Sequence, residues 1–162
     1  MPSRSMFNKI LLAVGSDNPS WEHVHVAGRL AARFGAQLTI VSVHRAVSQA
    51  LGEPQYSQTL LPRLDEVETV LESARSIAMA EGAAEPSTES LEGDPVERIA
   101  TLADGGGFDL LVIGTRQRGR IGSALLGSVS AGVAAHAHVP VLVVPESATA
   151  VRKGGADTSG VA

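Results

Sequence analysis

Residues 105–114 read GGGFDLLVIG, and this stretch decides the fold. Three glycines end the preceding segment, and residues 108–113 are almost wholly apolar. A short apolar run between glycines predicts a strand that is buried on both faces. Such strands occur in parallel sheets that helices cover on both sides, so the stretch predicts an α/β protein.

Similar apolar runs lie elsewhere along the chain. The other predicted strands cover residues 10–14, 38–43, 87–91 and 139–144. Between the strands, apolar residues recur at steps of three and four, which predicts helices. These helices cover residues 19–34, 62–82, 95–104 and 128–136. The repeated order of strand and helix predicts one parallel sheet with right-handed crossovers and helices on both faces.

Capping residues indicate where the helices begin. Asp94 precedes Pro95, so it can cap a helix whose first position is the proline. Asp17 or Asn18 is expected to cap the first helix in the same way. Pro62 is expected to open the long helix at 62–82, since proline is tolerated in a helix mainly in its first turn.

The length of the chain fits one domain. Its 162 residues and 16.7 kDa suit a single hydrophobic core. We expect this domain to cover residues 1–146, with residues 45–61 as a surface segment without clear periodicity. Residues 147–162 are rich in Ala, Gly, Ser and Thr and predict a disordered tail.

The composition excludes several classes of protein. A net charge of −4, with one Trp, one Tyr and three Phe, disfavours nucleic-acid binding. The absence of cysteine excludes a disulfide scaffold, a Cys-ligated zinc site and thiol catalysis. The apolar run at 10–14 is too short for a signal sequence or a membrane span, so we expect a cytoplasmic protein.

A ligand is expected outside the carboxyl ends of the strands, where open parallel sheets bind their ligands. Residues 114–130 read GTRQRGRIGSALLGSVS and contain three arginines, while residues 110–145 contain no acidic residue. Gly127 and Ser128 predict a helix start whose free amides attract an anion. Simple solvation of the arginines is the alternative, and we favour anion binding.

The sequence gives little indication of a metal site or of an enzyme active site. His23 and His25 lie two positions apart on one predicted helix and therefore face different directions. His136 and His138 flank a helix end, so all four histidines are expected to be solvated or to cap. Trp21 is expected to pack against the core. The sequence contains neither a Walker motif nor a His-x-Gly-His sequence, and we expect no enzyme.

The chain resembles the universal stress proteins. The resemblance rests on KILLAV at 9–14, EGDP at 92–95, FDLLVIG at 108–114, LGSVS at 126–130 and VPVLVVP at 139–145. It implies a five-stranded sheet of order 3-2-1-4-5 in a Rossmann-like fold of the adenine nucleotide alpha hydrolase type. It also implies a homodimer formed through the last strand, here Pro140 to Val144.

The ATP-binding branch of that family carries Gly, two residues, Gly, nine residues and then Gly-Ser or Gly-Thr. Gly114 and the pair at 127–128 have the matching separation. By resemblance, the main chain of Val43 would contact the adenine. The residues that the resemblance assigns to ATP, with magnesium left open, are Ala13, Val14, Gly15, Val43, Gly114, Thr115, Arg116, Gln117, Arg118, Gly127, Ser128, Val129 and Ser130.

Two positions depart from the family pattern. Gln117 stands where the middle glycine belongs, and Gly15 stands where an aspartate would contact the nucleotide. A side chain at 117 costs about 1–2 kcal/mol if the position needs a left-handed backbone. Loss of a buried carboxylate contact costs about 1.5–3 kcal/mol. Together they predict an affinity lower by about two to three orders of magnitude.

The leading hypothesis is a universal stress protein that binds adenine nucleotide as a sensor or regulator of the stress response. A second hypothesis is a nucleotide-independent dimeric module in which the last strand or residues 45–61 bind another protein. A weak ATPase comes third. The expected partners are a nucleotide, a second copy or another protein, and neither nucleic acid nor membrane.

Overall fold

The computed structural model describes residues 4–16, 20–115 and 127–145. Within them, five strands form one parallel sheet of order β3-β2-β1-β4-β5. The strands are β1 (Lys9–Ala13), β2 (Gln37–His44), β3 (Ser87–Glu92), β4 (Leu110–Thr115) and β5 (Val141–Pro145). The expected α/β class and the expected order 3-2-1-4-5 are therefore confirmed.

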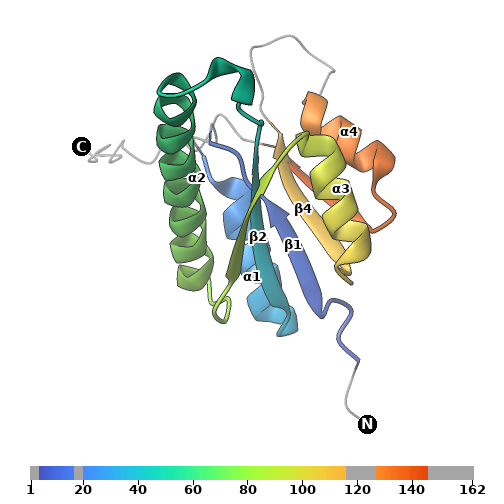
Figure 1. The fold of residues 1–162 in the computed structure, drawn as a ribbon. Coiled ribbons are helices and arrows are strands. Elements are labelled where there is room, and N and C mark those ends of the chain that lie inside the picture. The colour runs from blue at the N-terminus through green and yellow to red at the C-terminus, as the bar shows by residue number, and fades with distance from the viewer. Residues whose placement is uncertain (1–3, 17–19, 116–126, 146–162) are drawn as a thin grey trace, which may run out of the picture.

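Helices cover both faces of the sheet, with α1 and α2 on one face and α3 and α4 on the other (Figure 1). They are α1 (Glu22–Phe34), α2 (Gln55–Ala80), α3 (Pro95–Gly105) and α4 (Ser128–His136), with a short 3-10 helix, η1 (Gln49–Leu51), before α2. The described residues contain no helix long and apolar enough to cross a membrane.

The alternation of side chains along each strand creates two cores. In β1, Ile10 and Leu12 pack toward α1 and α2, whereas Leu11 and Ala13 pack toward α3 and α4. The three larger side chains are completely buried. A strand buried in this way must be apolar at every position, which is why β1 is a continuous apolar run and not an alternating one.

The edge strand β3 is polar and largely exposed, unlike β1. All of its residues except Leu91 are exposed, because only β2 pairs with it. Thr39 of β2 and Ser87 of β3 join their hydroxyls at 3.0 Å across this edge. Its polar sequence explains why residues 87–91 predict a strand only weakly.

The predicted start of α2 is wrong. The helix begins at Gln55, so Pro62 lies inside it and residues 55–61 are helical instead of irregular. Proline has no N–H to offer the carbonyl of Gln58 and normally breaks a helix interior. Both residues are exposed here, so water can satisfy that carbonyl. The apolar periodicity fails in this half of α2 because no core lies beneath it.

The start of α3 is confirmed in detail. Asp94 precedes the helix, and its carboxylate accepts a hydrogen bond of 3.0 Å from the amide of Glu97, while Pro95 is the first helical residue. α1 starts at Glu22, directly after Trp21, which packs against the core as expected. The predicted caps Asp17 and Asn18 lie outside the described residues, as does the predicted tail at 147–162.

Candidate functional site

A cavity of about 690 Å³ opens where β1, β2 and β4 end. The residues that follow β1 and β2, the first half of α3 and the first turn of α4 form its sides. The residues that line it are Ala13, Val14, Gly15, Ser16, Val43, Arg45, Pro95, Ile99, Ile113, Gly114, Gly127, Ser128, Val129 and Ser130. Its size falls within the range of about 300 to 1,000 Å³ that is typical of small-molecule sites.

Most of the residues expected to bind a ligand meet in this cavity. They come from three strand ends and one helix start: Ala13, Val14, Gly15, Val43, Gly114, Gly127, Ser128, Val129 and Ser130. Thr115 is not among the residues that line it, and its side chain is buried. Arg116, Gln117 and Arg118 lie outside the described residues.

The first turn of α4 presents free backbone donors. Gly127 precedes the helix in an extended conformation, and no side chain of the described residues caps the turn. Ser130 is buried, and its hydroxyl donates to the carbonyl of Gly127 at 3.1 Å, which holds the turn in place. The first amides of a helix have no intrahelical acceptor, so those of this turn are available to an anion in the cavity.

Gly127 also leaves room for a ligand. Among the described residues, a Cβ at this position would meet only the Ser130 hydroxyl, at an ordinary 3.7 Å. The backbone angles of Gly127, φ −69° and ψ 166°, suit any residue. The backbone conformation therefore does not require glycine, and the absence of a side chain leaves the cavity wider at this point.

Arg45 brings a positive charge to the cavity. It follows β2, and its main-chain carbonyl accepts a hydrogen bond of 2.9 Å from Nη1 of Arg63 on α2. Among the described residues that line the cavity, Arg45 is the one charged side chain, and none is a carboxylate. Arg45 closely follows the strand predicted at 38–43, at the end of the sheet where a ligand is expected, but it is not among the thirteen predicted site residues. A single arginine after a strand cannot be distinguished from a solvated one.

His23 contradicts the expectation of solvated histidines. It is completely buried on α1, against Gly114 of β4. Burial lowers the pKa of His23 from 6.5 to about 4, because a charged imidazole would lose its hydration. The expectation was wrong because His23 lies on the buried face of α1, together with Val24 and Ala27.

The other histidines of these pairs are more exposed. His25 contacts Glu81 at 2.7 Å, and His138 contacts Asp104 at 2.8 Å. The hydrogen bonds from His138 lower the pKa of the Asp104 carboxyl. His136 places Nδ1 2.7 Å from the carbonyl of Gly132, one turn earlier. Within the described residues, no group of three His, Asp or Glu side chains can hold a metal ion.

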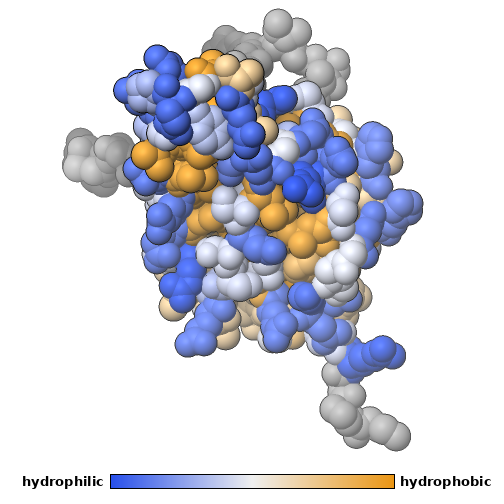
Figure 2. All heavy atoms as spheres, in the orientation of Figure 1, coloured by the Kyte–Doolittle hydropathy of each residue, from blue (hydrophilic) through white to orange (hydrophobic). Residues whose placement is uncertain are grey.

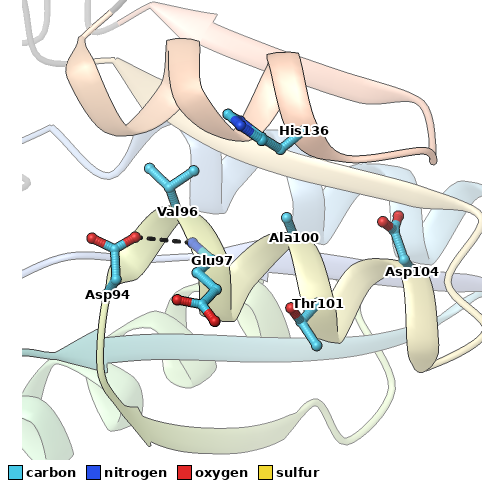
Figure 3. Close-up of a pocket in the computed structure, with 7 residues that line it drawn as sticks. All are labelled: Asp94, Val96, Glu97, Ala100, Thr101, Asp104 and His136. Carbon is cyan, nitrogen blue, oxygen red and sulfur yellow. Dashed lines mark hydrogen bonds between the residues drawn. The ribbon is translucent and has the colours of Figure 1, made fainter.

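A second cavity of about 540 Å³ lies between α3 and α4 (Figure 3). Val96 and Ala100 point toward α4, whereas Glu97 and Thr101 point away from it. Oδ1 of Asp94 already accepts a hydrogen bond from the amide of Glu97. Because its polar groups diverge, this groove lacks the converging donors and acceptors that mark a ligand site.

The sheet order and the cavity at the strand ends define the class. This is a doubly wound α/β protein whose strand-end cavity lies where the strand order reverses, between β1 and β4, the place where such folds bind their ligands. The Universal stress protein family matches the chain over residues 6–145. The chain belongs to this family, which confirms the resemblance read from its motifs.

Relatives from distant organisms support this assignment. A universal stress protein of Thermus aquaticus is 37% identical over 139 residues, which cover 86% of this chain and 99% of that protein. A universal stress protein of Methanocaldococcus jannaschii is 32% identical over 143 residues, which cover 86% and 83%.

Solved structures share the fold. A universal stress protein crystallised in complex with cAMP has a TM-score of 0.68 and 28% identity, over 87% of this chain and 98% of that one. The universal stress protein UspA of Lactobacillus plantarum has a TM-score of 0.74 and 23% identity, over 88% and 99%. The second likeness shows the fold alone.

Proposed function

We propose that this protein binds an adenine nucleotide, ATP, in the cavity at the ends of β1, β2 and β4, and acts as a nucleotide-responsive regulator in the stress response. The observation that carries the proposal is the uncapped first turn of α4, which faces this cavity beside Gly127. Backbone amides and a positive helix end suit phosphate oxygens.

The charges around the cavity favour the same ligand. Arg45 supplies a cation, and no described lining residue repels a phosphate. Arg116 and Arg118 follow β4 in the sequence and would add to this field. Magnesium would then be carried by the phosphates, since the described residues offer no cluster of carboxylates to hold it.

The apolar part of the cavity suits the base. Val43, Ile99 and Ile113 line it, so a flat ring can leave water there. The main chain of Val43 would hydrogen-bond the adenine edge. The cAMP-bound relative, at 28% identity, supports an adenine nucleotide as the ligand class.

Two residues set the expected affinity. Gly15 lines the cavity without a carboxylate, so one contact to the nucleotide is missing. Gln117 replaces a glycine of the family pattern. We therefore propose a site that responds to ATP in the range of about 0.1 to 1 mM and does not turn it over rapidly.

The proposal includes a homodimer through Pro140 to Val144 in the cytoplasm. β5 is an edge strand with one side unpaired by the other described strands, and its Leu142 is 37% exposed. Pairing with a second copy would cover both the edge and this leucine.

The proposal is tested by mass spectrometry of ligands released from freshly purified protein, followed by titration of Arg45→Glu with ATP. We expect a retained adenine nucleotide and an affinity for ATP at least about tenfold lower in the variant. Arg33→Glu, which changes the charge by the same amount at an exposed residue in the last turn of α1, away from the cavity lining, is the matched control. No retained nucleotide and no binding at millimolar ATP would favour the nucleotide-independent module instead.

A further inference from the structure

The first half of α2 lies outside the core. No residue from Gln55 to Glu66 is buried, whereas the second half buries Val67, Val70, Leu71, Ala74 and Ala78. The end of α2 that begins at Gln55 rises past the end of β2 (Figure 1). Helices gain most of their stability from packing an apolar face, so this half lacks the support that the other half has.

This unsupported half carries large apolar side chains. Leu61 is 59% exposed, Leu64 is 37% exposed, and Leu51 in the neighbouring η1 is 50% exposed. They are half of the six large hydrophobic residues that are exposed in the described part of the chain. Apolar spheres lie among hydrophilic ones over this end of α2 (Figure 2). A gathering of this kind marks an interaction surface more often than a scattered leucine does.

Two exposed acidic residues lie next to the exposed leucines on the same side of α2. Leu61, Leu64, Asp65 and Glu68 are spaced by three and four residues, so they lie on one side of the helix, and we call them the α2 stripe. All four are exposed, and neither carboxylate has an ion-pair partner among the described residues. One turn further on, Glu72 forms an ion pair with Arg75 at 3.7 Å, so the carboxylates without a described partner end at Glu68.

The charge around the stripe selects among partners. Residues 49–72 contain five carboxylates and one arginine, a net charge equal to that of the whole chain. That arginine, Arg63, donates to the main chain of Arg45. Nucleic acids and anionic lipid surfaces are therefore repelled. A second copy that docked through the same stripe would bring like charges together.

We propose that the α2 stripe docks a basic amphipathic helix of another protein. The apolar side of that helix would cover Leu61 and Leu64, and its Lys or Arg side chains would pair with Asp65 and Glu68. Recognition of an amphipathic helix joins an apolar contact that gives affinity to charges that select the partner. The stripe supplies both parts within two turns of one helix.

The test uses the full chain and two synthetic helices of about 18 residues, long enough to be helical when bound. One helix carries Leu on one side and Lys on the other, and the second carries Glu in place of Lys. Fluorescence anisotropy measures both. We expect the Leu/Lys helix to bind, the Leu/Glu helix not to bind, and Asp65→Lys/Glu68→Lys to weaken binding about tenfold or more.

Glu66→Lys is the matched control for the single variants Asp65→Lys and Glu68→Lys, because Glu66 is exposed on the opposite side of α2 and each of the three changes the charge by the same amount. We expect this variant to change the affinity less than about threefold. Leu61→Ser/Leu64→Ser should weaken binding as strongly as the charge reversal, with an unchanged melting temperature because the replaced side chains are exposed.

Three results would overturn the proposal. The first is an equal loss for Glu66→Lys and for the single variants Asp65→Lys and Glu68→Lys, which would show general attraction to an acidic protein. The second is equal binding of the Leu/Lys and Leu/Glu helices. The third is a change from dimer to monomer in Leu61→Ser/Leu64→Ser on sedimentation, which would assign the stripe to a second copy.

Discussion

The imidazole of His23 lies against the Cα of Gly114. A Cβ at position 114 would lie 3.0 Å from both Cγ and Nδ1 of His23, closer than the roughly 3.5–4.0 Å at which carbon atoms attract. His23 is completely buried, so it has no solvent into which it can move. The buried face of α1 thus fixes the residue type at the end of β4, beside the cavity.

This contact predicts that Gly114→Ala destabilises the protein by about 1–3 kcal/mol, as overpacking of a core does. Urea unfolding measures the change. His23→Ala should relieve the crowding, so that Gly114→Ala costs less in that background by about 1 kcal/mol or more. Additive effects of the two substitutions would show that the contact is not the cause.

His23 also predicts a pH dependence of stability. Its native pKa of about 4 lies below the ordinary 6.5, so the unfolded chain binds more protons between these values. Stability should therefore fall as the pH is lowered from 6.5 toward 4, by about 3 kcal/mol in total from this residue. Unfolding of His23→Gln, which does not titrate, should lack this component. The same slope in both proteins would refute the assignment.

Replacing Gly28 of α1 by alanine should destabilise the protein, although helix propensity alone predicts that the change is stabilising. A Cβ at Gly28 would lie 3.0 Å from the Cα of Ala78 on α2, so Gly28→Ala should push the two helices apart and cost about 1–3 kcal/mol. Gly105→Ala at the end of α3 meets nothing within 4 Å and should be neutral or stabilising by up to about 1 kcal/mol. Thermal unfolding compares the two, and equal effects would contradict the close packing of α1 on α2.

Removal of the Asp94 cap of α3 should cause a smaller loss of stability. Asp94→Ala should destabilise the protein by about 1 kcal/mol, because the amide of Glu97 loses its acceptor. Asp94→Asn retains an acceptor and should lose only a few tenths of that amount. Chemical unfolding of both variants checks this, and an alanine variant as stable as the native chain would contradict it.

The fold was predictable from the sequence because its strands are buried on both faces. Runs such as Leu110 to Ile113 have no exposed side, so local composition alone indicates a covered parallel strand. Asp94 and Pro95 were predictable for a similar reason, since a cap acts through its own neighbours in the sequence. The order of the strands came from the family resemblance and not from these patterns.

The misread parts depend on contacts that are distant in sequence. The start of α2 was missed because residues 55–66 do not pack on a core and so have no periodic apolar face. The burial of His23 depends on the missing side chain of Gly114, 91 positions further along the chain. The position of Arg45 in the cavity could not be predicted, because the cavity is formed by the ends of β1, β2 and β4, which are distant in the sequence.

Calorimetric titration with ATP and magnesium, performed on the native chain and on Gly127→Val, tests the central claim most directly. Valine suits the backbone angles of Gly127, and among the described residues its Cβ would make only an ordinary contact with Ser130, so the variant should fold and fill part of the cavity. We predict binding to the native chain with a dissociation constant of about 0.1–1 mM and an affinity at least about tenfold lower in the variant. Equal affinities, or no heat from the native chain at about 10 mM ATP, would contradict nucleotide binding at the start of α4.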